Sequence, residues 1–158
     1  MKTVAEILRS KQHAAVYSVS PTASVLDAIS LMAEKGIGAL VVLEGNRLAG
    51  IVSERDYVRK VELLKRSAFS AKVSDIMTAE VITIGPRDTS QHCLQLMTDR
   101  HLRHLPVLAE GELIGLLSIG DRLARRQPLL RRQGRPAILS VEPRSATRRS
   151  CMVVAPPG

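Results

Sequence analysis

The spacing of apolar residues changes along the chain in a way that predicts a strand followed by a helix. Val16–Val19 is a short run typical of extended structure, and Pro21 ends it. Ser24 then has the character of an N-cap, and apolar residues recur at helical spacing as far as Gly36. The face of this helix that we expect to be buried comprises Val25, Ala28, Ile29, Met32 and Ala33.

Two short apolar runs follow, and they predict a β-hairpin. Residues 39–43 and 48–52 flank the turn-forming sequence at 44–47, where glycine and asparagine favour a tight reversal. After Asp56 the spacing returns to that of a helix, which we expect to reach about Arg66. The apolar face expected for this closing helix comprises Val58, Val61 and Leu64.

The same order of elements occurs a second time. Displacing the chain by 65 residues aligns 16–56 with 81–121 without a gap, and 11 of the 41 positions are identical. Thr89 takes the place of the capping serine, before a helix expected to bury Cys93, Leu94 and Met97. The strands expected in this second copy are 81–84, 105–108 and 113–117.

A short helical opening precedes each copy. Val4–Leu8 resembles Val73–Met77, now at an offset of 69 residues. The fold class is therefore expected to be α/β (α+β), with two β-α-β-β-α units packed as a pseudo-twofold pair, because each unit must bury one face of its strands against the other. We expect these units at residues 1–66 and 67–127, followed by a tail at 128–158.

Charge is distributed unevenly, and this changes what the net charge of +8 means. Residues 1–121 carry 14 basic and 14 acidic side chains, whereas 122–158 carry nine arginines and one glutamate. Pro128 disfavours a helical conformation at the residue before it, and arginine, proline and serine then dominate without a period. The tail is expected to be largely disordered, dispensable for the folded units, and able to hold nucleic acid only weakly.

Several classes of protein are disfavoured by the composition. No apolar run approaches the roughly 20 residues of a membrane helix, and Met1–Ser10 lacks the apolar core of a signal peptide. The two cysteines, Cys93 and Cys151, do not suggest a disulfide framework. We therefore expect a cytoplasmic protein.

One motif occurs at the same place in both copies. Residues 50–56 and 115–121 each read as glycine, two apolar residues, serine, and aspartate three positions later. The serine and aspartate would lie where a helix begins, beside free main-chain N–H groups that attract phosphate. A carboxylate accepts hydrogen bonds from the two hydroxyls of a ribose, so the motif suits a phosphorylated sugar. The alternative is an ordinary helix N-cap.

Taken in order, these features resemble a known family. The paired β-α-β-β-α units, the sequence Val-Ser-Asp-Ile-Met-Thr from residue 73, the sequence Leu-Arg-His-Leu-Pro-Val from residue 102 and the repeated motif are similar to a tandem pair of cystathionine β-synthase (CBS) domains. The resemblance covers residues 1 to about 126. It implies a regulatory module that binds AMP, ADP, ATP, NAD(H) or S-adenosylmethionine between the units and forms homodimers.

The resemblance also implies which residues would meet the ligand. Asp56 and Asp121 would hold the ribose, and Ser53 and Ser118 would lie on the phosphate side. The remaining expected site residues, at the adenine pockets and the phosphates, are Ser18, Ile37, Gly38, Ala39, Arg55, Thr83, Arg103, His104 and Pro106. The two sites are not expected to be equivalent, because Gly120 stands where the first copy has Arg55, and Arg103-His104 where it has Gly38-Ala39.

Other chemistry finds little support in the sequence. His92, Cys93, His101 and His104 fit no zinc-ligand spacing, and neither a nucleophile elbow nor a phosphate-cradling glycine loop is present. We therefore expect no metal and no enzymatic activity. Three functions stay open: an adenine-nucleotide sensor acting on an unidentified partner protein, a purely structural dimerisation module, and a nucleic-acid-associated protein that uses the arginine-rich tail.

Overall fold

The computed structural model describes residues 1–11, 15–121 and 138–141. The first copy of the repeat and the segment before it hold α1 (Val4–Ser10), β1 (Val16–Val19), α2 (Val25–Lys35), β2 (Ala39–Glu44), β3 (Arg47–Ser53), α3 (Glu54–Tyr57) and the π-helix η1 (Val58–Glu62). The remaining elements are α4 (Val73–Ile76), α5 (Ser90–Asp99), β4 (His104–Ala109), β5 (Glu112–Ser118) and β6 (Ile138–Val141).

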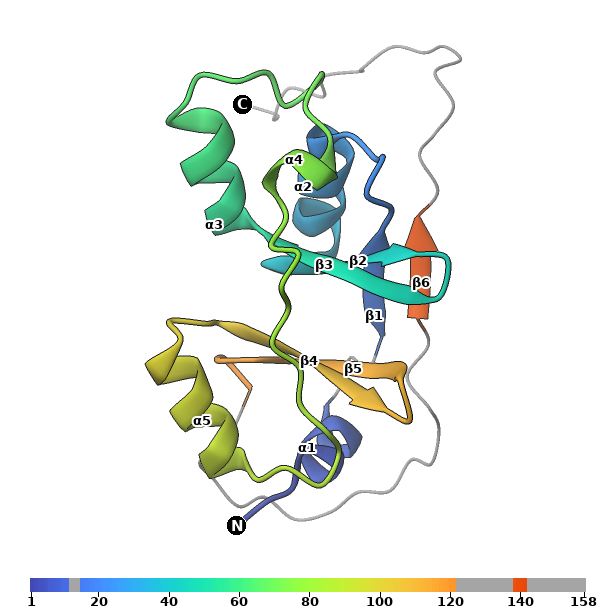
Figure 1. The fold of residues 1–158 in the computed structure, drawn as a ribbon, viewed down its shortest axis with the longest axis vertical. Coiled ribbons are helices and arrows are strands. Elements are labelled where there is room, and N and C mark those ends of the chain that lie inside the picture. The colour runs from blue at the N-terminus through green and yellow to red at the C-terminus, as the bar shows by residue number, and fades with distance from the viewer. Residues whose placement is uncertain (12–14, 122–137, 142–158) are drawn as a thin grey trace, which may run out of the picture.

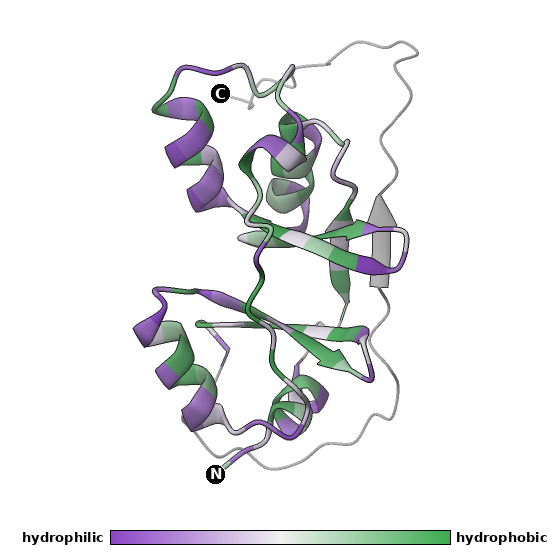
Figure 2. Cartoon of the chain, in the orientation of Figure 1, coloured by the Kyte–Doolittle hydropathy of each residue, from purple (hydrophilic) through white to green (hydrophobic). Residues whose placement is uncertain are grey.

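The molecule has two β-sheets in its middle and helices on both outer sides (Figure 1). The upper sheet has the strand order β3-β2-β1-β6, in which β1 is parallel to both of its neighbours and β3 is antiparallel to β2. The lower sheet is the antiparallel pair of β4 and β5. Strands are largely hydrophobic, and polar residues gather on the helices and turns (Figure 2). The expected pair of α/β units is confirmed.

The repeat seen in the sequence is also present in the hydrogen-bond register. Both hairpins have a register irregularity at the same place, between Val42 and Leu43 and between Val107 and Leu108. The hydroxyls of Ser24 and Thr89 both accept from the main-chain N–H three residues on, at 3.0 and 3.2 Å, and so cap α2 and α5. On α2, however, Leu31 is buried and Ala33 is exposed, contrary to the expected apolar face.

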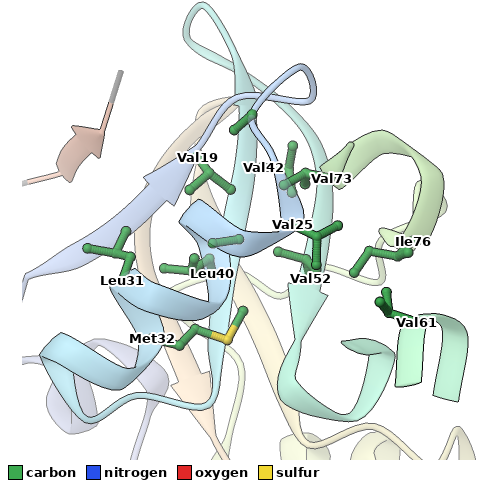
Figure 3. Close-up of a cluster of buried hydrophobic side chains, with 12 residues drawn as sticks. Val19, Val25, Leu31, Met32, Leu40, Val42, Val52, Val61, Val73 and Ile76 are labelled. Atoms are coloured by element: carbon green, nitrogen blue, oxygen red, sulfur yellow. The ribbon is translucent and has the colours of Figure 1, made fainter. Parts of the chain in front are cut away.

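The short opening helix of each half packs against the other half. Val4 and Ile7 of α1 lie in the core built around α5, β4 and β5, whereas Val73 and Ile76 of α4 lie in the core around α2 (Figure 3). The main-chain N–H of Val4 donates to the carbonyl of Asp88 at 2.8 Å, and that of Val73 donates to Ala23 at 2.8 Å. We call α1 and α4 the exchanged helices.

A third apolar cluster holds the two sheets together. It comprises Val16, Val41 and Leu43 from the upper sheet and Leu113 from the lower one, all buried. Leu48, Leu108 and Leu116 pack around it. Burial of the facing sides of the strands therefore requires both halves, as the sequence predicted.

The expected strand at 81–84 is not formed. Ile84 makes a single parallel bridge to Val107, with main-chain hydrogen bonds to Pro106 and Leu108 of 3.0 and 2.9 Å. This bridge corresponds to the pairing of Val19 with Val42 in the first half. β1 is paired on both sides, whereas 81–84 is held only by β4 within the described part of the chain, and one bridge does not make a regular strand.

The closing helix of the first half is shorter than expected and has a different period. It begins as α3, continues as the π-helix η1 and ends at Glu62, not near Arg66. The wider turn places Val61 in the core but leaves Val58 and Leu64 48% and 57% exposed, so these three residues do not share one buried face. The Tyr57 hydroxyl donates to the carboxylate of Glu62 five residues on, which raises the pKa of Tyr57.

Part of the tail is ordered, within the stretch 128–158 that the sequence predicts to be largely disordered. Ile138–Val141 forms β6 and pairs in parallel with Val16–Val19 over the full length of β1. The other residues expected to be disordered, and Cys151, lie outside the described residues. No helix in the described part of the chain is long and apolar enough to span a membrane.

Candidate functional site

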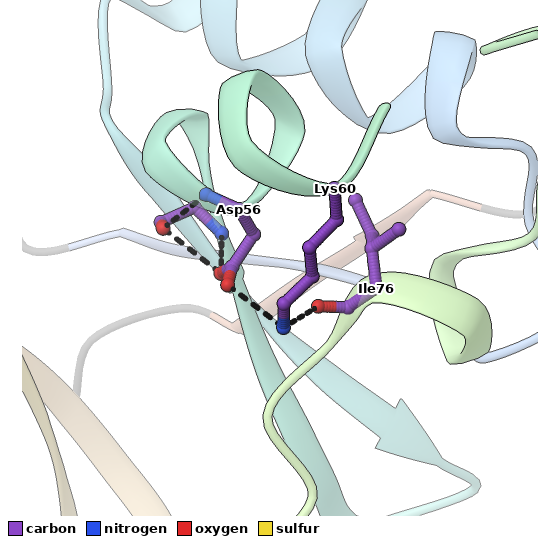
Figure 4. A network of polar contacts seen from close by, with 4 residues as sticks. Asp56, Lys60 and Ile76 are labelled. Carbon is purple, nitrogen blue, oxygen red and sulfur yellow. Dashed lines mark hydrogen bonds and ion pairs between the residues drawn. The ribbon is translucent and has the colours of Figure 1, made fainter. Parts of the chain in front are cut away.

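In the first copy of the motif, the serine and aspartate are bonded to each other. The hydroxyl and the main-chain N–H of Ser53 both donate to Asp56 Oδ2 at 2.9 Å, and the N–H of Asp56 donates back to the hydroxyl at 3.2 Å (Figure 4). The other carboxylate oxygen, Oδ1, lies 3.2 Å from the ammonium of Lys60. The capping box and Lys60 together engage both carboxylate oxygens and the hydroxyl.

In the second copy the same residue types are arranged more openly. The main-chain N–H of Ser118 donates to Asp121 Oδ2 at 2.6 Å, and the ammonium of Lys11 lies 2.7 Å from the same oxygen. The N–H of Asp121 donates to the main-chain carbonyl of Ser118, not to its hydroxyl. Within the described residues, the Ser118 hydroxyl and Asp121 Oδ1 therefore have no hydrogen-bond partner.

The glycine that begins each motif makes room for the exchanged helix. A Cβ on Gly50 would lie 2.8 Å from Met77 Sδ and 2.9 Å from the carbonyl oxygen of Thr78. A Cβ on Gly115 would lie 2.7 Å from two methyl carbons of Leu8. Leu8 and Met77 are related by the same offset of 69 residues as the two helices. These glycines thus allow the C-terminal part of each exchanged helix, or the residue that follows it, to lie directly against the strand that carries the glycine.

The two halves also meet beside the second motif. A Cβ on Gly38 would lie 3.9 Å from the imidazole of His104 and 3.6 Å from the carboxylate of Glu54. Across the hairpins, Ala39 pairs with Ser53 and His104 pairs with Ser118. The structure thus brings Gly38 and His104 of the expected site set together, and adds Glu54, which the sequence did not single out.

Charges around His104 favour its neutral form. Burial and the neighbouring Arg103 lower the pKa of His104, Asp121 acts in the opposite direction, and Lys11 lowers it further. The imidazole therefore offers one donor and one acceptor at neutral pH, beside a serine and an aspartate.

The other expected site residues lie at different depths. Ser18 is buried in the middle of β1, whereas Thr83 is exposed, so this matched pair is not equivalent in space. Arg55 and Arg103 are exposed and Ile37 is half-buried. Ala39 and Pro106 are buried, and the carbonyl of Pro106 accepts from Ile84. The assignment of these residues to ligand pockets stays a prediction.

Lys11 and Lys60 are the chemically important residues that sequence reasoning missed. Lys11 donates to the carbonyl of Leu116 at 2.6 Å as well as pairing with Asp121, and Lys60 donates to the carbonyl of Ile76 at 2.7 Å. The repeat could not reveal Lys11, because the offset that aligns the exchanged helices places Glu80, not a lysine, opposite it.

Comparison with protein families decides the identity of the fold. The model of the CBS domain matches residues 3–63 and again 73–126. The chain belongs to the CBS domain family. It holds two CBS domains in tandem, and each match includes one copy of the serine–aspartate motif.

Individual CBS proteins resemble the chain to different degrees. The mitochondrial CBS domain-containing protein CBSX3 of Arabidopsis thaliana is 42% identical over 127 residues, which are 75% of this chain but 62% of the plant protein. A putative signal-transduction protein with CBS domains from Burkholderia ambifaria MC40-6 has a solved structure that is 52% identical, with a TM-score of 0.74 over 76% of this chain and 90% of that one.

A more distant CBS pair shares the fold alone. The CBS domain pair of protein MJ0100, solved in complex with 5′-methylthioadenosine and S-adenosyl-L-methionine, is 20% identical to this chain. Its TM-score is 0.66, over 77% of this chain and 92% of that one.

Proposed function

We propose that this protein is a regulatory module that binds an adenosine-containing ligand between its two CBS domains and passes the ligand state to a partner protein. The ligand class comprises AMP, ADP, ATP, NAD(H) and S-adenosylmethionine. The module acts by binding and not by catalysis.

The second motif carries this proposal. Ser118 offers its hydroxyl and Asp121 offers its carboxylate oxygen Oδ1. Neither of these two atoms has a hydrogen-bond partner among the described residues. The ammonium of Lys11 lies beside them. A ribose needs an acceptor for its hydroxyls and a phosphate needs donors and a cation, so this group suits a phosphorylated nucleoside.

The wider family supports the choice of adenosine. The MJ0100 pair, of the same fold, holds 5′-methylthioadenosine and S-adenosyl-L-methionine. A neutral His104 and the backbone near Gly38, on opposite halves, would flank the base in this arrangement.

A thermal-shift panel of the five ligands tests the proposal. A ligand that binds only the folded state raises the melting temperature by mass action, so at least one should do so at millimolar concentration. Flat melting curves with every ligand would favour the structural alternative, a dimerisation module without a ligand.

Alanine variants of the two aspartates test the assignment of the sites. We expect Asp121→Ala to weaken binding by about 1.5 to 3 kcal/mol, the usual scale for a lost hydrogen bond to a charged group. Asp56→Ala should have a smaller effect on affinity, because Ser53 and Lys60 already engage its carboxylate. Unchanged titrations for both variants would contradict the assignment.

A homodimer is part of the proposal, with revised contact residues. Val61 is fully buried and cannot form an interface, whereas Val58, Leu63 and Leu64 are exposed on and just after η1. Exposed apolar residues close together favour association. Light scattering at tens of micromolar should give a dimeric mass for the full chain and a monomeric mass for Leu64→Glu. A monomeric full chain would refute the dimer.

Two expectations from the sequence stay predictions. A cytoplasmic location is one, and the plant relative named above is mitochondrial. Weak binding of nucleic acid is the other, because the arginines that would provide it lie outside the described residues. Binding that persists after residues 128–158 are deleted would remove the tail from this role.

A further inference from the structure

Each motif aspartate is tied by a lysine to one of the exchanged helices. Lys11 directly follows α1, and its ammonium joins Asp121 Oδ2 to the carbonyl of Leu116 on β5. Lys60 lies on η1 and joins Asp56 Oδ1 to the carbonyl of Ile76, the last residue of α4.

We call these two sets of contacts the Lys11 tether and the Lys60 tether. Each joins a motif to an exchanged helix, but they differ in which of the two segments supplies the lysine and which supplies the carbonyl. In the second motif, the exchanged helix supplies the lysine and the motif strand supplies the carbonyl. In the first, the motif helix supplies the lysine and the exchanged helix supplies the carbonyl. Lys11 is also the less exposed of the two, with 22% of its side chain accessible compared with 40% for Lys60. Ionic contacts are screened less where water is excluded, so the Lys11 tether is the stronger.

We propose that Lys11 binds the phosphate of a ligand held at Asp121 and thereby couples ligand binding to the packing of helix α1. The ammonium of Lys11 and the main-chain N–H of Ser118 converge on one oxygen of Asp121, at 2.7 and 2.6 Å. A phosphate placed beside the Ser118 hydroxyl is therefore within reach of the lysine. This inference rests on the proposed function.

The direction of the coupling follows from the charges. A nucleotide phosphate carries more negative charge than one carboxylate and competes for the ammonium, while the ribose hydroxyls donate to Asp121. The ammonium then leaves the carbonyl of Leu116. This loosens the C-terminal end of α1, which Leu8 otherwise holds against Gly115. A ligand without phosphate does not compete in this way and leaves the tether in place.

Affinities for AMP and adenosine, measured by calorimetry on the full chain, test the role of Lys11 in recognising phosphate. We expect Lys11→Met to lower the ratio of AMP affinity to adenosine affinity by about tenfold, the scale of one charge-assisted hydrogen bond. Lys11→Arg keeps the cation and should retain most of the ratio. Lys2→Met is the matched control, because it removes a cation from the same segment and no ion pair or side-chain hydrogen bond of Lys2 occurs among the described residues.

Hydrogen exchange of the α1 amides tests the coupling itself. In the unaltered protein, AMP should speed exchange in α1 and adenosine should not. In Lys11→Met, exchange in α1 should be fast without ligand and insensitive to AMP. A purely structural lysine would change the basal rate but would leave the response to AMP intact, and this result would overturn the proposal.

The remaining outcomes separate this inference from the proposed function. If AMP binds but Lys11→Met leaves the affinity ratio unchanged, the coupling fails and the ligand site stands. If S-adenosylmethionine binds and AMP does not, the coupling also fails. If no adenosine ligand binds the unaltered protein, both proposals fail together. Lys11→Gln provides the same comparison if Lys11→Met does not fold.

Discussion

The two CBS domains place the same serine and aspartate at the same point of the same hairpin, yet they use these side chains differently. In the first domain, Ser53, Asp56 and Lys60 bond to one another and hold the start of the closing helix. In the second, Ser118 and Asp121 leave a hydroxyl and a carboxylate oxygen free of partners within the described chain. An identical motif can therefore be fully engaged in capping a helix in one copy and keep polar atoms without partners, within the described chain, in the other.

Both copies of the motif help to pack an exchanged helix. The glycine of each motif lies against a residue in or just after an exchanged helix, Met77 for Gly50 and Leu8 for Gly115, so motif and helix are in contact in both domains. Both domains should therefore lose stability when this packing is removed, and they should differ in ligand binding.

The largest effect on stability should come from truncating the side chains that the exchanged helices bury. Ile7→Ala and Ile76→Ala each remove a side chain that is almost fully buried in the core of the opposite half. Each should lower the free energy of unfolding by about 3 kcal/mol, measured by urea denaturation. Phe69→Ala, on an exposed side chain, should change it little. A small effect for one isoleucine alone would show that the exchange matters in only one half.

Substitution of the motif glycines should separate the two domains. Gly50→Ala places a methyl group against the main-chain carbonyl of Thr78, which cannot move easily, and should cost about 2 kcal/mol. Gly115→Ala meets only the end of the Leu8 side chain and should cost less than about 1 kcal/mol. Thermal or urea unfolding measures both. Leu8→Ala in the Gly115→Ala background should relieve the clash, and equal costs at the two glycines would contradict the difference.

Truncation of the tail should affect the first domain only. Ending the chain after Val141 keeps β6, whereas ending it after Gln127 removes β6 and leaves β1 as the edge of its sheet. We expect the shorter form to be less stable by about 1 kcal/mol, the scale of a few main-chain hydrogen bonds with water as the alternative. Faster amide exchange in β1 would locate the change. Equal stability of the two truncated forms would restore the expectation of a dispensable tail.

The smallest effect should be on the pH dependence of stability, to which His104 of the second domain contributes. Burial and Arg103 lower the pKa of His104 in the folded state below its ordinary value of 6.5. The stability contributed by neutral His104 is therefore present above about pH 6.5 and is lost as the pH falls below it toward the folded-state pKa. Urea unfolding of His104→Gln between pH 8 and 5 should show a weaker decline than the unaltered protein. His92→Gln, at an exposed position on α5, controls for the loss of a histidine.

The repeat made much of the fold predictable from the sequence. The hairpins and the caps at Ser24 and Thr89 depend on local residue types, and each was supported by a second copy. Residues 81–84 failed to form a strand, although they are as apolar as Val16–Val19. A strand needs partners, and those of β1 include β6, which no local pattern in the tail had indicated.

The candidate site was predictable as a set of residue types but not as an arrangement. Ser53 and Ser118 look alike in sequence, and only the positions of Lys60 and Lys11 distinguish their surroundings. These lysines are not related by the repeat. Lys11 follows an exchanged helix, whereas Lys60 lies on the helix that follows its own motif. The π-helix η1 was likewise not predicted, because the spacing after Asp56 is that of an ordinary helix. The residue that η1 buries is Val61.

The exchanged helices also fix the order in which the protein can mature during synthesis. Domains generally fold as units while the chain emerges, from the N-terminal end first. Here the core around α2 lacks Val73 and Ile76 until α4 has been made, so the first domain waits for residues beyond its own hairpin. The core around α5 uses Val4 and Ile7, which precede the rest of that core in the sequence and must remain unburied until β5 is complete. Helix α1 is thus made before every other element of the core in which Val4 and Ile7 are buried, and it must wait for that core to form.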